Sequence, residues 1–183
     1  ESVGLLLARS LEQVSEGSCH VLAVVGLLAL APFECEPIAR ALDITGRQTK
    51  GLLAELVDCG LIHRDGKRYE VSHALVHIYA QRRIAVPDGA LQRLANYYTN
   101  FAKTESENGF TGYARLDGER VHMLRVLADC MGEEAWEFAH SMVWAMEGYL
   151  DLQGHWLELV TVLKTGMLTA RQLDQQGDEE RFL

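Results

Sequence analysis

The stretch that decides the fold spans residues 34–80 and reads ECEPIARALDITGRQTKGLLAELVDCGLIHRDGKRYEVSHALVHIYA. Its first half contains two apolar patterns at the three-and-four spacing of a helix face, over residues 36–42 and 47–60. Thr45 and Gly46 stand between them as turn and cap residues, and the second pattern ends in a glycine suited to the left-handed position after a helix. This half therefore predicts two helices joined by a short turn.

The second half of the stretch predicts a β-hairpin followed by a helix. Two short extended patterns, residues 61–64 and 67–71, flank Asp65-Gly66, the preferred pair for a two-residue type I′ turn. Such a turn would set Ile62 opposite Tyr69 and direct the basic side chains beside the turn outward. The order of helix, turn, helix, hairpin and serine-capped helix predicts a winged helix-turn-helix, with the hairpin as its wing.

The composition indicates a mainly α-helical chain. Of its 183 residues, 48% are hydrophobic and only three are proline, which excludes wholesale disorder and favours long helices. No apolar run reaches ~18 residues, so we expect no membrane span. Four widely spaced cysteines fit a reduced, cytoplasmic compartment better than a disulfide framework. The chain opens without Met inside a helical pattern, Leu5 to Val14, so we expect a leading helix and a longer parent protein.

Charge is unevenly distributed along the chain. Residues 1–86 carry 9 Lys and Arg against 10 Asp and Glu, a net charge of −1, whereas residues 87–183 carry 8 against 16, a net charge of −8. The second part is therefore not a nucleic-acid surface. We expect a winged-helix domain with its leading helix over residues 1–86 and a separate helical domain over residues 87–183.

The second domain contains evenly spaced glycines. Gly109, Gly132, Gly154 and Gly177 are 23, 22 and 23 residues apart, which predicts tetratricopeptide-like antiparallel helical hairpins of an α-solenoid. We expect a loop over residues 109–118 and a further helix after the last of these glycines. The predicted helices are Leu91–Glu105, Glu119–Met131, Glu133–Leu152 and Trp156–Gln172. Their predicted inward residues are Tyr97, Tyr98, Phe101, Leu124, Leu127, Trp136, Ala139, Val143, Met146, Trp156, Leu159 and Leu163.

Several segments together resemble one protein family. LLALAPF over 27–33, IARAL over 38–42, LLAELVDCGLI over 52–62 and YEVSHALVHIYA over 69–80 resemble the winged-helix domain of NB-ARC-type STAND ATPases. The later sequence, notably Gly154-His155-Trp156 and the run to Ala170-Arg171, is similar to the tetratricopeptide arrays that follow this domain in bacterial members. The resemblance implies a bacterial, cytoplasmic signal-transduction protein.

The resemblance also implies a regulatory role. In that family the winged helix docks on an upstream nucleotide-binding module of the same chain and stabilises its ADP-bound state, while the repeats sense a protein, peptide or other ligand. The full-length parent would bind ADP and ATP and act as an ATPase. This chain contains no Gly-x-x-x-x-Gly-Lys-Ser/Thr loop, so we expect no enzyme activity, catalytic residue or cofactor in the chain by itself.

His73 is the site residue that the resemblance carries over. The family often has Met-His-Asp at the start of the helix after the wing, with the histidine contacting the ADP phosphate, and Ser72-His73-Ala74 stand there. The acidic partner is absent. An imidazole beside the N–H groups at a helix start suits phosphate binding, and the alternative is that His73 only pairs with a neighbouring backbone group. His77 completes a zinc spacing with His73, but no third ligand is near in sequence, so we expect no metal.

Two other classes of function compete with this interpretation. A DNA-binding regulator is favoured by basic and polar residues on the second helix and the wing, and is opposed by Glu55, Asp58 and Asp65 on the same surface and by a pI near 5.2. DNA is therefore the less favoured partner. The candidate DNA contacts are Arg47, Gln48, Lys50, Arg64, Lys67 and Arg68. A free-standing repeat scaffold would instead bind a peptide in its groove, with Trp144, Tyr149 and His155 as candidates.

Overall fold

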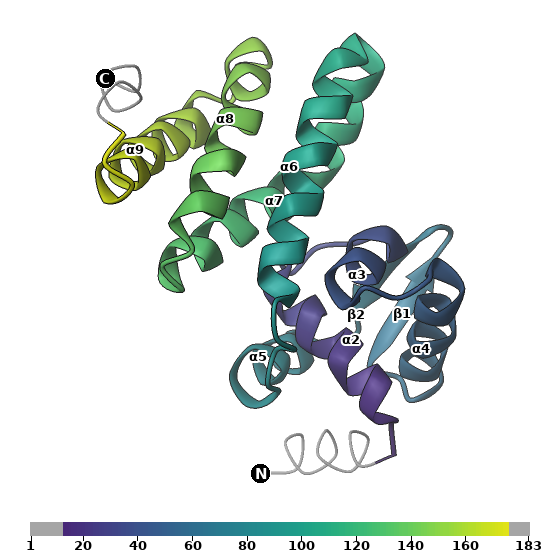
Figure 1. The fold of residues 1–183 in the computed structure, drawn as a ribbon. Helices are drawn as coiled ribbons and strands as arrows, with labels where there is room; N and C mark the ends of the chain where they lie inside the picture. The colour runs from purple at the N-terminus through teal and green to yellow at the C-terminus, as the bar shows by residue number, and fades with distance from the viewer. Residues whose placement is uncertain (1–12, 176–183) are drawn as a thin grey trace. The chain divides into compact units, whose positions relative to one another are not determined.

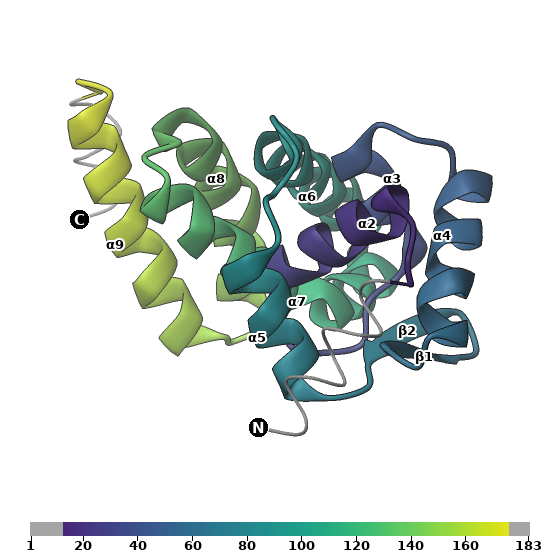
Figure 2. The ribbon, with the colours of Figure 1, turned by 90° about the horizontal axis from the view of Figure 1, so that it is seen from below.

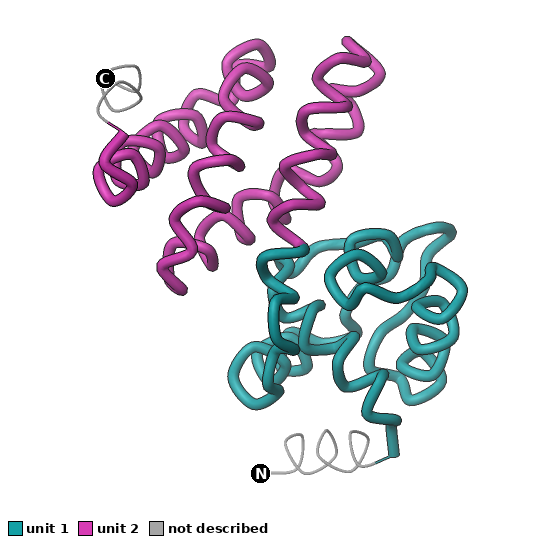
Figure 3. Tube along the Cα trace, in the orientation of Figure 1, with its two compact units in different colours: residues 1–93 teal, residues 94–183 magenta. Residues whose placement is uncertain are grey.

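The computed structural model describes residues 13–175, which form a mainly α-helical fold with one two-stranded antiparallel sheet (Figure 1). The chain divides into two compact units, residues 1–93 and 94–183 (Figure 3). The elements are α2 (Glu16–Leu27), α3 (Cys35–Leu42), α4 (Gly46–Asp58), β1 (Ile62–Asp65), β2 (Arg68–Val71), α5 (Ala74–Arg83), α6 (Ala90–Glu107), α7 (Gly109–Gly132), α8 (Trp136–Leu152) and α9 (Trp156–Gln172). None of these helices is both long and apolar enough to cross a membrane. The predicted leading helix falls almost wholly on residues 1–12, outside the described part.

Helix α2 is the centre of the first unit. Its side chains Val21, Leu22 and Val25 are almost completely buried, as expected of a helix that is apolar on all sides. Helices α3, α4 and α5 all pack against it. Helices α2 and α5 approach each other closely at Gly26, because a Cβ there would lie 3.0 Å from the backbone nitrogen of Gln81. The core of this unit therefore depends on a glycine as well as on apolar side chains.

The two predicted helices of the opening motif are confirmed as α3 and α4, and local chemistry ends each of them. Asp43 follows α3 with a left-handed φ of 54°. Thr45 caps α4, because its Oγ1 accepts the N–H of Gln48 while the Gln48 side chain accepts the N–H of Thr45 at 3.0 Å. Gly60 follows α4 with φ 69° and donates its N–H to the carbonyl of Val57 at 2.9 Å. The predicted turn residues therefore act as caps.

The β-hairpin is present, but the predicted register and turn are wrong. The register pairs Ile62 with Val71, His63 with Glu70, Arg64 with Tyr69 and Asp65 with Arg68. The loop is Gly66-Lys67, and only Gly66 has a positive φ, of 57°, whereas a type I′ turn needs positive φ at both residues. The observed pairing differs from the predicted one by two residues, which leaves every side chain on the same face. Hydrophobic alternation therefore predicts the faces but not the partner of Ile62.

Phe33, far from the hairpin turn in sequence, fixes the position of β2. Phe33 and Tyr69 exchange two backbone hydrogen bonds of 2.8 Å each, and their rings stack with centroids 6.0 Å apart. Tyr69 therefore has backbone partners on both sides. The hairpin lies beside α4 (Figure 2), and this contact places the hairpin next to the second helix of the motif.

In the second unit, the loop predicted over residues 109–118 is wrong, because this segment forms the first turns of α7. Its glycines serve the corner between α6 and α7. Gly109 has φ 59°, and a Cβ at Gly112 would collide with the carbonyl oxygen of Glu105. Leu116 in the same segment is completely buried. The glycines that suggested a loop are therefore required by a tight helical corner.

The glycine spacing predicts helix ends better than it predicts their caps. Gly154 follows α8 with φ 73°, whereas α7 includes Gly132 as its last residue and the left-handed residue after it is Glu134. The helix predicted after Gly177 lies outside the described residues. Helix α8 packs against both α7 and α9. Of the predicted inward residues, Tyr98, Leu127, Ala139, Val143 and Met146 are buried, but Trp156 is 68% exposed.

Candidate functional site

The N-cap of helix α5 is His73, not the predicted cap Ser72. The His73 backbone is extended, with φ −152°, and its Nδ1 accepts the backbone N–H of Leu75 at 3.1 Å. Ser72 donates its own backbone N–H to the carbonyl of Leu61 at 3.1 Å. The contact between His73 and a neighbouring backbone group, left open by the sequence, is therefore present.

This cap hydrogen bond determines where neutral His73 carries its proton. Because Nδ1 accepts a hydrogen bond, the proton of the neutral ring is on Nε2. His73 is exposed, and Nε2–H has no partner among the described residues. The backbone N–H of Ala74, at the first position of α5, also lacks one within the described part. Two donors and the positive end of the helix dipole thus meet at one exposed helix start, an arrangement suited to a phosphate.

His77 anchors α5 and is not a second ligand beside His73. Its Nε2 lies 2.9 Å from the carbonyl oxygen of Leu28, and the side chain is buried. Val76 and Ala80, on the same helix, are buried as well. Across residues 13–175 no group of three His, Cys, Asp or Glu is arranged to hold a metal ion. The buried side of α5 thus fixes the helix while His73 stays in solvent.

The six candidate DNA contacts lie on α4 and the hairpin. Some of their side chains, among them Gln48 and Arg64, make hydrogen bonds within the first unit. The exposed cations are Arg47, Lys50, Arg64 and Lys67, whereas Arg68 is half-buried. The Gln48 carboxamide belongs to the cap of α4. Arg64 donates Nε–H to the Gly66 carbonyl at 2.9 Å and lies over a tyrosine ring. The surface therefore offers fewer available cations than the roughly 6–10 phosphate contacts of a typical DNA-binding face.

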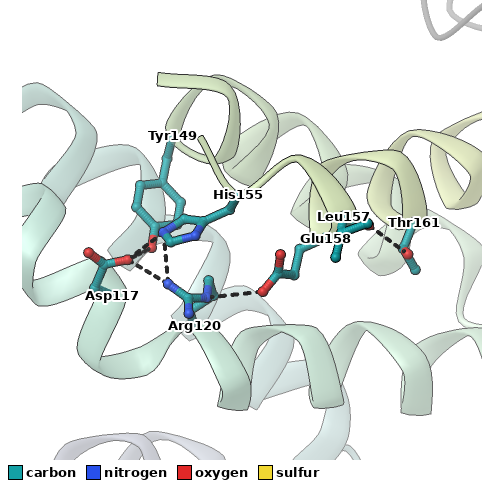
Figure 4. Close-up of polar contacts among 7 residues, drawn as sticks. All are labelled: Asp117, Arg120, Tyr149, His155, Leu157, Glu158 and Thr161. Carbon is teal, nitrogen blue, oxygen red and sulfur yellow. Dashed lines mark hydrogen bonds and ion pairs between the residues drawn. The ribbon is translucent and has the colours of Figure 1, made fainter. Parts of the chain in front are cut away.

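A polar network that the sequence did not predict joins three helices of the second unit (Figure 4). Asp117 and Arg120 come from α7, Tyr149 from α8, and His155 and Glu158 from the start of α9. The Asp117 Oδ1 accepts the Tyr149 hydroxyl and lies 2.7 Å from both Arg120 Nη1 and His155 Nε2. Arg120 Nε lies 3.5 Å from the Glu158 carboxylate. One carboxylate oxygen thus ties α7 to α8 and α9.

The protonation states of the network residues suit a structural role, in which their hydrogen bonds hold α7, α8 and α9 together. Burial raises the pKa of Tyr149 above its usual range, and the hydrogen bond to Asp117 adds to this, so the phenol stays a donor. Burial also acts to raise the pKa of Asp117, but hydrogen bonds from Tyr149 and His155 outweigh it and hold that pKa below its ordinary value. Tyr149 and His155, predicted as groove residues, are therefore engaged in packing. Trp144 likewise donates its Nε1–H to His140 at 2.9 Å.

The two candidate sites differ in what they offer a ligand. The His73 end of α5 has donors that are exposed and without partners in the described part. In the network of the second unit, by contrast, most polar groups contact one another, and the buried Nε of Arg120 makes no hydrogen bond among the described residues but lies 3.5 Å from the Glu158 carboxylate. The start of α5 is therefore better suited to bind a phosphate or another anion than the network around Asp117 is. Comparisons of the chain with protein-family models, with curated proteins and with solved structures found no match.

Proposed function

We propose that this chain is the regulatory part of a STAND-type ATPase. In this proposal, residues 1–86 are a winged-helix domain that docks on an upstream nucleotide-binding module of the same protein and stabilises its ADP-bound state. The helices over residues 87–183 are tetratricopeptide-like repeats that bind a protein or peptide partner and transmit that event. The chain by itself hydrolyses no ATP.

The observation that carries the proposal is the geometry of His73. Its Nδ1 is occupied by the N–H of Leu75, so Nε2–H is the donor that remains for a ligand. Its position at the start of α5 places it beside the positive end of the helix dipole and beside the N–H of Ala74, which has no partner among residues 13–175. These are the features that a histidine needs to contact the phosphate of ADP on a neighbouring module.

The element order of the first unit supports the same proposal. Helices α3 and α4 are joined by a capped turn, the hairpin begins two residues after Gly60, and α5 begins three residues after the end of β2. A winged helix-turn-helix has this order. In the second unit, α7, α8 and α9 are joined by short turns at Gly132 and Gly154, as antiparallel hairpins of a repeat array require.

The test is nucleotide retention in the full-length parent, with the region encoded upstream of Glu1 included. We expect His73→Ala to speed ADP release by roughly 10- to 100-fold, because a hydrogen bond to a charged group contributes about 1.5–3 kcal/mol. His73→Asn keeps a good helix cap, so its release rate separates loss of the phosphate contact from loss of the cap. The matched control is His63→Ala, which removes an exposed histidine of β1 that pairs with Glu70.

The outcomes separate the possible roles of His73. Faster release in both His73 variants, with the His63 variant unchanged, supports the phosphate contact. Faster release in His73→Ala alone assigns the effect to the cap. Unchanged release in both variants, or an upstream region that retains no nucleotide, contradicts the proposal. Release is followed with a fluorescent ADP analogue, and bound nucleotide is identified by chromatography of the denatured protein.

A further inference from the structure

Helix α6 belongs to both compact units. It spans Ala90–Glu107, and the boundary between the units falls after Arg93, at the end of its first turn (Figure 3). Residues 90–107 include neither glycine nor proline, the usual causes of a sharp kink in a helix. The helix therefore passes from one unit into the other without a residue that would bend it.

Arg93 ties the first turn of α6 to the end of α3. Its Nε donates a hydrogen bond to the carbonyl oxygen of Ala41 at 2.7 Å, and its Nη2 donates one to the carbonyl oxygen of Asp88 at 3.1 Å. Ala41 lies in the last turn of α3, where carbonyl groups have no partner within the helix and attract a positive charge. Gly89 has φ 72°, and a Cβ there would lie 2.8 Å from Arg93 Nη1, so this glycine leaves room for the guanidinium.

Tyr98, five residues after Arg93 on the same helix, provides an anchor in the second unit. Its side chain is completely buried, and its hydroxyl donates a hydrogen bond to the carboxylate of Glu119 on α7 at 3.1 Å. At a rise of 1.5 Å per residue, the two anchoring residues are only about 7.5 Å apart along α6. A shift of α6 along its axis, or a rotation about it, therefore acts on both hydrogen bonds.

We propose that Arg93 couples the two units, as the positioning residue through which a change in the helices of residues 94–183 reaches the end of α3. Its guanidinium is the hydrogen-bond partner of the Ala41 carbonyl, so loosening of α6 deprives the end of α3 of its cap. Destabilisation of the second unit is then felt in the last turn of α3 and in the turn before α4. The coupling requires no nucleotide, so it holds or fails independently of the role proposed for His73.

The test is a double-mutant cycle read by native-state amide hydrogen exchange of the whole chain. The reporter is the backbone N–H of Ile44, which donates to the carbonyl of Ala39 at 3.0 Å just after α3. Met146→Ala destabilises the second unit from α8, because it leaves a cavity at a buried position. We expect this substitution to speed exchange at Ile44 by at least about 5-fold, the lower end of typical coupling between sites. In the Arg93→Ala background it should leave the exchange rate at Ile44 unchanged.

Two further variants separate coupling from a purely local role of Arg93. Tyr98→Phe keeps the buried ring but removes the hydroxyl, so it should weaken the response of Ile44, and it supplies the test if Arg93→Ala does not fold. Arg82→Ala, the matched control, removes an exposed arginine of α5 and should leave the response intact. Far-UV circular dichroism verifies that each variant is folded. No response of Ile44 to Met146→Ala in the wild-type background, or the full response in the Arg93→Ala or Tyr98→Phe background, overturns the proposal.

Discussion

Replacing Gly26 with alanine tests the close approach of α2 and α5. The new Cβ would lie 3.0 Å from the backbone nitrogen of Gln81 and 3.1 Å from the carbonyl carbon of Ala80. Backbone atoms cannot rotate away, so the two helices must separate by a few tenths of an ångström. Overpacking of this kind costs about 1–3 kcal/mol, and alanine in a helix regains about 0.5–1 kcal/mol relative to glycine. We therefore expect a net loss of about 1 kcal/mol in the free energy of unfolding.

The matched control is Gly51→Ala in α4. A Cβ there has no neighbour within 4 Å, so only the helix propensity changes and the variant should gain about 0.5–1 kcal/mol. All three tryptophans lie in residues 94–183. The first unit is therefore followed by far-UV circular dichroism during urea unfolding and by amide hydrogen exchange of α2, not by tryptophan fluorescence. Equal stabilisation by both substitutions would refute the close approach of α2 and α5.

Three further predictions concern single groups and one surface. Hydrogen bonds from Ser18 and Ser15 hold the pKa of Glu55 below its usual value, so the stability they provide is present at neutral pH and is lost as the pH falls through that lowered pKa. Glu55→Gln should therefore lower the free energy of unfolding at pH 7 and approach the wild type in acid, as urea unfolding from pH 7 to pH 3 would measure. Burial raises the pKa of the Cys130 thiol to about 12, so a thiol reagent at about pH 8 should modify it at least roughly 100-fold more slowly than an exposed cysteine, with Cys130→Ser identifying the slow phase. For the DNA alternative we expect no mobility shift of a DNA duplex even at low salt, and a shift that weakens with added salt and disappears in Lys50→Ala would favour it instead.

Helix ends were predictable from the sequence where a few neighbouring residues determine them. Thr45 caps α4 through Gln48, three residues away, and Gly60 ends it with a left-handed φ. Such contacts depend on local chemistry, which the sequence displays directly. The position of α9, Trp156–Gln172, was predicted in full for the same reason, since Gly154 marks the turn before it.

The errors arose where distant residues decide the structure. The hairpin register depends on Phe33, which pairs with Tyr69 across 36 positions of the chain. The helical segment around Gly112 was predicted as a loop because its glycine suits both a loop and a close approach to the Glu105 carbonyl. Only the packing of α6 on α7 distinguishes these two uses of glycine.

The network around Asp117 was missed for the same kind of reason. Asp117 and Arg120 form an i, i+3 pair that a helix would have brought together, but Asp117 stood in the predicted loop. Its contact with His155 spans 38 residues and has no sequence signature. The contact of His73 with a neighbouring backbone group, by contrast, was among the predicted alternatives, because it depends only on the start of one helix.

The two roles considered for His73 are compatible, because they use different ring nitrogens. The resemblance implies a neighbouring aspartate, and Ala74 stands in its place, so the imidazole needs another group to orient it. The backbone N–H of Leu75 provides that group, since its hydrogen bond to Nδ1 leaves the proton on Nε2, the side that remains for a ligand. In the proposed function, the cap would then support the phosphate contact rather than replace it. This predicts that substitutions which weaken the start of α5 impair ADP retention even when His73 itself is unchanged.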